Sequence, residues 1–92
     1  MNKCLKIQLT LEMKEGFLQS FIQHNARLFD LEGTAQFTSP DKLRVVVCGE
    51  KDLVDNFIDI IHKESLPSGI TDIEIEPYIK DKDYRGVFRV IE

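Results

Sequence analysis

The sequence lacks three features that would each assign a class of function. It has no apolar run near the roughly 18 residues that cross a bilayer, so a membrane protein is not expected. It has no basic surplus, because the formal net charge is −4 and the pI about 5.1, which disfavours nucleic acid and anionic membrane surfaces as partners. Its two cysteines, Cys4 and Cys48, are too few and too far apart for a zinc site or a disulfide framework, so two reduced thiols are expected.

The chain is also short, and its start is not expected to be an export signal. Its 92 residues predict one domain, residues 1–92, in which any site is shallow. The start, "MNKCLKIQLTLEM", alternates polar and apolar residues instead of presenting a charged head followed by an apolar block. A cytoplasmic location is therefore expected.

Hydrophobic periodicity predicts each element of the fold. A period of two over "LKIQLTLEM" indicates a half-buried strand, and apolar spacings of three and four from Phe17 indicate a helix that ends near Asp30. The segment "TAQFTSPDKLRVVVCG" predicts a hairpin whose second arm is interior. Further elements follow in order: a helix over "EKDLVDNFIDIIHKE", a charged edge strand from residue 70 to before Pro77, a polar loop over residues 78–86, and a last strand over "VFRVI".

The elements up to the charged strand follow the order βαββαβ. Right-handed crossovers then place both helices on one face of an antiparallel sheet, which is the ferredoxin-like α+β arrangement. This fold hosts enzymes, metal carriers, RNA binders and ligand sensors, so it does not assign a function.

The stretch "LEMKEGFLQSF" is where the first strand gives way to the first helix. A glycine loop between a strand and a helix can hold an anion, because main-chain N–H groups point at it from the helix start. The candidate anion-binding loop runs from Lys14 to Gln19, namely Lys14, Glu15, Gly16, Phe17, Leu18 and Gln19.

Beyond this loop the chain resembles the acylphosphatases, small βαββαβ enzymes that hydrolyse the carboxyl-phosphate bond of acyl phosphates. "NARLFDLEGTAQF" is similar to the family's helix end and following strand, and "SPDKLRVVVCGEKDLVDNF" to its turn, third strand and second helix opening. "LPSGITDIEI" and the closing "FRVIE" also fit. The matching positions are Ala26, Leu31, Gly33, Gly49, Val54 and Phe57.

Both reactive positions of the family differ here. With the chain aligned on Ala26, Gln19 stands where the family has the arginine that binds the phosphoryl group, and Phe37 stands where it has the asparagine that positions water. No arginine precedes Arg27, and loss of a comparable charged clamp lowers the rate by on the order of 10³ or more. The resemblance therefore implies a scaffold without catalytic residues.

Three functions remain open. The leading hypothesis is an acylphosphatase-like domain without efficient hydrolysis that acts as a binding or regulatory module, with a small anionic ligand and no cofactor. The second is an active acylphosphatase with a substituted site that uses Lys14 and the Ser20 hydroxyl. The third is a ligand-sensing or self-associating ferredoxin-like module that pairs through an exposed edge strand, so the chain would be a monomer or a weak homodimer.

Other chemically active residues do not form a site in the sequence. His24 and His62 lie on different predicted helices with no partner at ligand spacing, so no metal site is expected. Acidic pairs such as Asp52 with Asp55, or Glu74 with Glu76, are typical of solvated faces. If the first and third strands are antiparallel neighbours, however, the two cysteines can approach each other across them and form a redox-sensitive pair.

Overall fold

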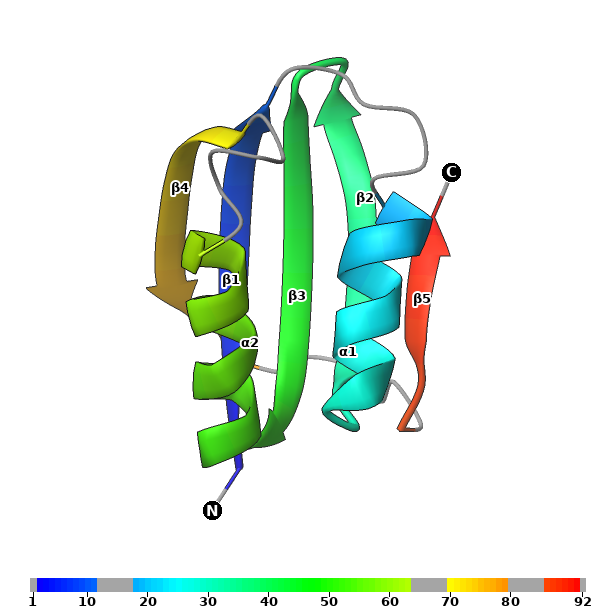
Figure 1. Ribbon diagram of the computed structural model, residues 1–92, viewed down its shortest axis with the longest axis vertical. Helices are drawn as coiled ribbons and strands as arrows, with labels where there is room; N and C mark the ends of the chain where they lie inside the picture. Colours follow the sequence, from blue (N-terminus) through cyan, green and yellow to red (C-terminus); the bar gives the residue numbers. More distant parts are fainter. Residues whose placement is uncertain (1, 12–17, 64–69, 80–85, 92) are drawn as a thin grey trace.

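The structure is a computed structural model that describes residues 2–11, 18–63, 70–79 and 86–91. Figure 1 shows the elements in chain order. They are β1 (Asn2–Leu11), a π-helical segment η1 (Leu18–Gln23) that continues into α1 (His24–Leu28), β2 (Glu32–Ser39), β3 (Lys42–Glu50), α2 (Lys51–Lys63), β4 (Ile70–Pro77) and β5 (Phe88–Ile91). No helix in these ranges is long and apolar enough to span a membrane.

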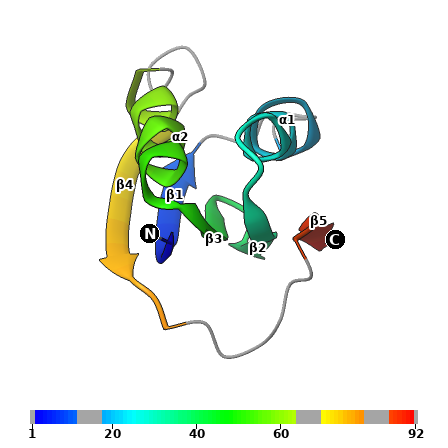
Figure 2. The same cartoon turned by 90° about the horizontal axis from the view of Figure 1, so that it is seen from below.

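The strands form one five-stranded sheet in the order β4-β1-β3-β2-β5. Figure 2 shows both helices on the same face of this sheet, as the ferredoxin-like fold requires. The β1–β3, β1–β4 and β2–β3 pairs are antiparallel, whereas β5 runs parallel to β2, so the sheet is mixed. The predicted fold class is confirmed.

The core lies between the sheet and the two helices. Alternation along the central strands directs Ile7 and Leu9 of β1 and Val45 of β3 into it, all fully buried. Helix α2 contributes Val54, Phe57 and Ile61 from one apolar stripe. Residues of the opposite parity lie on the other face of the sheet, which the helices leave uncovered and which we call the open face.

The predicted elements agree with the structure in type and order. The hairpin turns at Pro40 and Asp41, β3 is interior, and β4 is an edge strand, as its acidic residues indicated. The predicted end of the first strand, the linker over residues 65–69 and most of the 78–86 loop lie outside the described residues.

The connection from α1 to β2 is tight and fixes how the helix meets the sheet. Asp30 adopts a left-handed conformation, with φ 55°, just after the helix. The Leu31 N–H donates to the Ala26 carbonyl at 2.9 Å and the Asp30 N–H to the Arg27 carbonyl at 3.1 Å, which is the Schellman pattern of a helix C-terminus. Gly33 follows with φ 142°, and a Cβ there would lie 1.8 Å from the Val46 carbonyl oxygen.

The expectation of two separate thiols is wrong. Cys4 and Cys48 are direct Cα partners across β1 and β3, and the structure joins them in a disulfide. Their count and distant sequence positions carry no information on strand register, which is what brings them together. The alternative of a cross-strand approach is the one that the structure bears out, whereas their sensitivity to redox conditions stays a prediction.

Candidate functional site

The candidate site is the end of the sheet where η1 begins and β2 ends. Figure 1 shows these two ends on the same side of the molecule. Gln19 is the second residue of η1, and Phe37 lies three residues from the start of the β2–β3 turn. The structure therefore brings the two positions to one end of the fold. The side chain of Gln19 lies outside the described part, as do Lys14, Glu15, Gly16 and Phe17 and the side chain of Leu18.

Phe37 occupies the helix-facing side of β2. It shares that side with buried Gly33 and Ala35, and its Cα partner on β3 is the fully buried Leu43. Its ring is half-buried and packs against the core. An aromatic ring of this kind fills space and excludes water, but it can neither accept nor donate a conventional hydrogen bond to a reacting water molecule.

The first helix begins with a wide π-helical turn before it continues as an α-helix. Where η1 meets α1, the side-chain amide of Asn25 in α1 donates a hydrogen bond to the carbonyl of Phe21 in η1 at 2.8 Å. Such π-helical segments are rare and often occur at functional sites, because they shift the side chains that follow relative to an α-helical register. Ile22 and Ala26, both fully buried, anchor this helix to the core.

The arginines that the structure describes lie elsewhere. Arg27 is in the last turn of α1, on the order of 10 Å along the helix axis from Gln19. Arg44 and Arg89 have the parity of the open face, on the side of the sheet away from the helices. Lys42, beside the β2–β3 turn, shares that parity. Arg44, Arg89 and Lys42 therefore lie on the face of the sheet opposite to Phe37.

Charged side chains at other places form structural pairs. The Lys3 and Lys51 ammonium groups contact Asp55 at 2.5 and 3.2 Å, and hydrogen bonds from these two groups hold the pKa of Asp55 below its usual value. The hydrogen bond between Lys51 and Asp55, together with the negative charge of Asp55, raises the pKa of Lys51 above its usual value. This cluster lies at the start of α2, and in it the carboxylate of Asp55 is held by two lysines.

The described residues contain no group of three or more histidine, cysteine or acidic side chains that could hold a metal ion. His24 and His62 are exposed on separate helices. The Lys6 ammonium pairs with Glu76 at 2.7 Å, so the acidic pair of β4 is partly neutralised.

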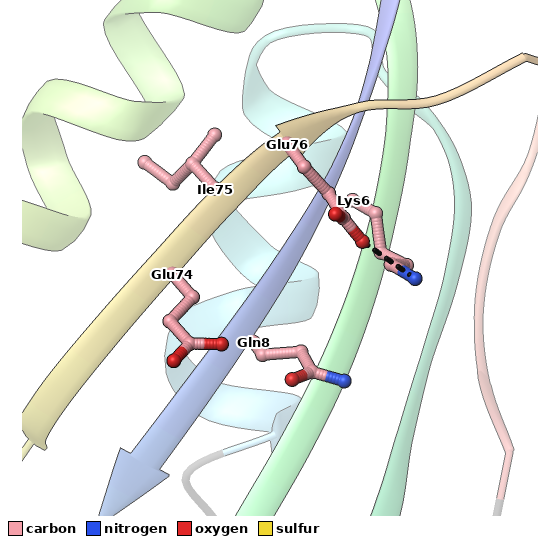
Figure 3. Close-up of a pocket in the computed structure, with 5 residues that line it drawn as sticks. All are labelled: Lys6, Gln8, Glu74, Ile75 and Glu76. Atoms are coloured by element: carbon pink, nitrogen blue, oxygen red, sulfur yellow. Dashed lines mark ion pairs between the residues drawn. The ribbon is translucent and has the colours of Figure 1, made fainter.

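Two hollows were not anticipated from the sequence. One of about 240 Å³ lies at the C-terminal end of α1 and is lined by Arg27, Asp30, Leu31, Gly86, Val87 and Phe88. The other, of about 90 Å³, lies over β1 and β4 and is shown in Figure 3 with its lining residues Lys6, Gln8, Glu74, Ile75 and Glu76. Each combines segments far apart in sequence, so only the strand order and register could have located it.

Comparison with known proteins agrees with this architecture. The acylphosphatase family model matches residues 14–90. The chain belongs to the acylphosphatase family. A search of curated proteins finds no match.

Solved structures resemble this acylphosphatase-family chain over its whole length. An acylphosphatase from Coxiella burnetii has 19% identity and a TM-score of 0.83, covering 98% of this chain and 93% of that one. An acylphosphatase from Bacillus subtilis has 16% identity and a TM-score of 0.82, covering 100% of both chains. Full-length HypF in its phosphate- and nucleotide-bound form has 22% identity and a TM-score of 0.83, covering 100% of this chain and 12% of that one. At these identities the likeness establishes the fold.

Proposed function

We propose that this acylphosphatase-family domain acts as a binding or regulatory module without efficient acyl phosphate hydrolysis. The observation that carries the proposal is Phe37, whose half-buried ring packs against the core. Alignment on Ala26 assigns this position to the family's water-positioning asparagine. A phenyl ring cannot orient an attacking water molecule.

The charge at the helix start supports the same proposal. Gln19 offers an amide donor but no permanent positive charge, whereas phosphoryl transfer needs charge stabilisation on the equatorial oxygens. Main-chain N–H groups at a helix start can still bind an anion without that charge. A small anionic ligand is therefore the ligand class that we propose for this loop, which agrees with HypF having been solved with phosphate bound.

The proposal is tested by hydrolysis of benzoyl phosphate with the purified chain. We expect turnover well below about 1 s⁻¹, the low end of ordinary enzyme rates. The double variant Gln19→Arg with Phe37→Asn restores both family groups and should raise turnover by on the order of 10³. Matched controls are Gln23→Arg, which adds the same charge one turn further along the helix, and Phe37→Leu, which removes the ring without adding an amide.

Wild-type turnover above about 1 s⁻¹ that is abolished by Gln19→Ala would overturn the proposal and favour the active enzyme with a substituted site. In that case Lys14→Met and Ser20→Ala should each lower the activity, since these are the groups that the alternative uses. Circular dichroism of each variant separates loss of activity from loss of fold.

A further inference from the structure

The outer edge of β4 presents main-chain groups with which no described strand pairs. β4 is at one end of the strand order, so no described strand pairs with its outer side. The Tyr78 N–H donates to the Cys4 carbonyl at 3.2 Å, and the β1–β4 register continues without a shift as far as Thr10. Hydrogen-bonded and non-hydrogen-bonded pairs alternate along an antiparallel ladder. The pairs Lys6–Glu76 and Gln8–Glu74 are therefore the hydrogen-bonded ones.

This alternation directs the N–H and C=O groups of Ile73 and Ile75 away from β1, toward the outer edge. Pro77 has the same parity but no N–H, so the row of outward donors ends before it. At the other end of the strand, the Thr71 hydroxyl donates to the Thr10 carbonyl at 3.1 Å, next to the register shift between Thr10 and Leu11. The open ladder is thus short and defined at both ends.

The side chains of β4 differ between its two faces. Asp72, Glu74 and Glu76 lie on the open face, and Ile73 and Ile75 lie on the helix side, where Ile75 is 39% exposed. Figure 3 shows Ile75 directed to the opposite side of the strand from Glu74 and Glu76. Glu76 pairs with Lys6, but neither Asp72 nor Glu74 forms an ion pair with any residue that the structure describes.

A second copy of β4 is a poor occupant for this edge. The three acidic residues all have even numbers, so an antiparallel register that pairs the Ile73–Ile75 segments of two copies with their open faces together places a carboxylate opposite a carboxylate. Like charges directly opposite each other destabilise a strand pair. The edge therefore disfavours its own copy and favours a strand of opposite charge.

We propose that β4 binds an added strand from a partner whose extended segment carries lysine or arginine at alternate positions with apolar residues between them. The partner's main chain would pair with Ile73 and Ile75, as in other strand-addition complexes. Its basic side chains would meet Asp72 and Glu74 on the open face, and its apolar side chains would cover exposed Ile75. This surface is separate from the end of the fold that carries Gln19 and Phe37, so the inference does not depend on the loss of hydrolysis.

The competing explanation is that the acidic row only protects the edge from unwanted pairing, as charges on edge strands often do. That explanation predicts no binding of a basic strand. The proposal predicts instead that a basic strand binds. Its binding should weaken with added salt, on loss of the charge of Glu74, and on loss of the outward N–H of Ile75.

The test uses the intact chain and the fluorescent peptide Ac-Lys-Val-Lys-Val-Lys-Val-Lys, with the matching Glu-Val peptide as control. Anisotropy at about 150 mM salt should give a dissociation constant below about 1 mM for the basic peptide only. Glu74→Lys should weaken binding at least about tenfold. Asp59→Lys, an equal charge change at an exposed position of α2, should change it less than about twofold, because α2 lies on the face of the sheet opposite to Glu74 and an exposed charge is screened by salt.

Two main-chain measurements complete the test. Ile75→Pro removes an outward N–H without breaking the β1–β4 ladder, so it should abolish peptide binding while the domain stays folded. In hydrogen exchange, the amides of Glu74 and Glu76 should already be protected in the free chain, whereas those of Ile73 and Ile75 should become protected only with peptide.

Failure of the basic peptide to bind, or equal binding by Ile75→Pro, would overturn the proposal. So would a dimer of the free chain that Ile75→Pro dissociates, because the edge would then belong to a second copy. If Ile75→Pro does not fold, the Glu74→Lys comparison and the exchange pattern decide the question.

Discussion

Cys4 of β1 lies directly opposite Cys48 of β3, and a disulfide joins them with their Cα atoms 4.1 Å apart. The main chain of Cys4 bonds toward β4, so its pair with Cys48 is of the non-hydrogen-bonded kind, in which Cα atoms approach most closely. The bridge spans a sequence separation of 44 residues, which includes the first helix and the whole of β2. It therefore joins β1 to β3, and the loop that it closes contains the first helix and β2, which carry Gln19 and Phe37.

Reduction of this disulfide should lower the free energy of unfolding by about 4 kcal/mol, because a closed loop of this length restricts the unfolded chain. Urea unfolding with and without dithiothreitol measures the change. The double variant Cys4→Ser with Cys48→Ser is the control and should show one midpoint under both conditions. An unchanged wild-type midpoint, with thiols detected by mass after reduction, would contradict the prediction.

Replacing Asp30 by glycine should stabilise the domain. Asp30 is exposed and holds φ at 55°, a conformation that costs an L-residue energy but that glycine adopts freely. We expect Asp30→Gly to raise the free energy of unfolding by about 0.5–1 kcal/mol and Asp30→Ala to lower it. Thermal and urea unfolding of both variants check this, and an Asp30→Gly variant less stable than the wild type would refute the conformational argument.

Gly33 and Gly86 form a matched pair for a steric test. Both have positive φ, but a Cβ at Gly33 would collide with the Val46 carbonyl, whereas no residue that the structure describes lies within 4 Å of a Cβ at Gly86. Gly33→Ala should therefore destabilise the domain by about 3 kcal/mol or more, and Gly86→Ala by only about 1 kcal/mol from strain. Urea midpoints measure both values. Equal losses would show that backbone strain, and not the contact with β3, dominates at Gly33.

Much of this architecture could be predicted from apolar spacing. The period of two in β1 and the stripe of α2 reflect which side chains face the core, and the core is the strongest constraint on the sequence. The acidic residues of β4 indicated an edge because charged side chains are one way in which exposed edge strands avoid unwanted pairing. In these cases the residue pattern within one segment predicts where that segment lies in the fold.

Other features depend on register, which no single segment encodes. The opposition of Cys4 and Cys48, and the alignment of Glu74 with Gln8, follow only once the strands are placed against each other. For the candidate site, alignment on Ala26 predicted that Gln19 and Phe37 occupy the reactive positions. This stays a prediction, and the structure shows only that both residues lie at one end of the fold. The half-buried state of Phe37 could not be predicted, because it depends on how the first helix packs on the sheet, and the spacing of apolar residues does not give that packing.

The pKa of Asp55 offers a test of the cluster at the start of α2. Hydrogen bonds from Lys3 first, and from Lys51 second, stabilise the ionised carboxyl and lower its pKa below its ordinary value. Lys3→Met should therefore raise the pKa of Asp55 more than Lys51→Met does, measured by carbon-detected NMR titration of the side-chain carboxyl. A larger effect of Lys51→Met would reverse the assigned order of the two partners.

The same shift sets the sign of a pH dependence. Because the pKa of Asp55 is lower in the folded than in the unfolded state, its contribution to stability is present above the unfolded value and is lost as pH falls through the folded one. Asp55→Asn should thus flatten the acid side of the stability curve below about pH 4, without changing its shape near neutrality. The difference should shrink in high salt, since these groups are substantially exposed. A variant that loses stability equally at all pH values would mean that Asp55 acts through packing and not through its charge.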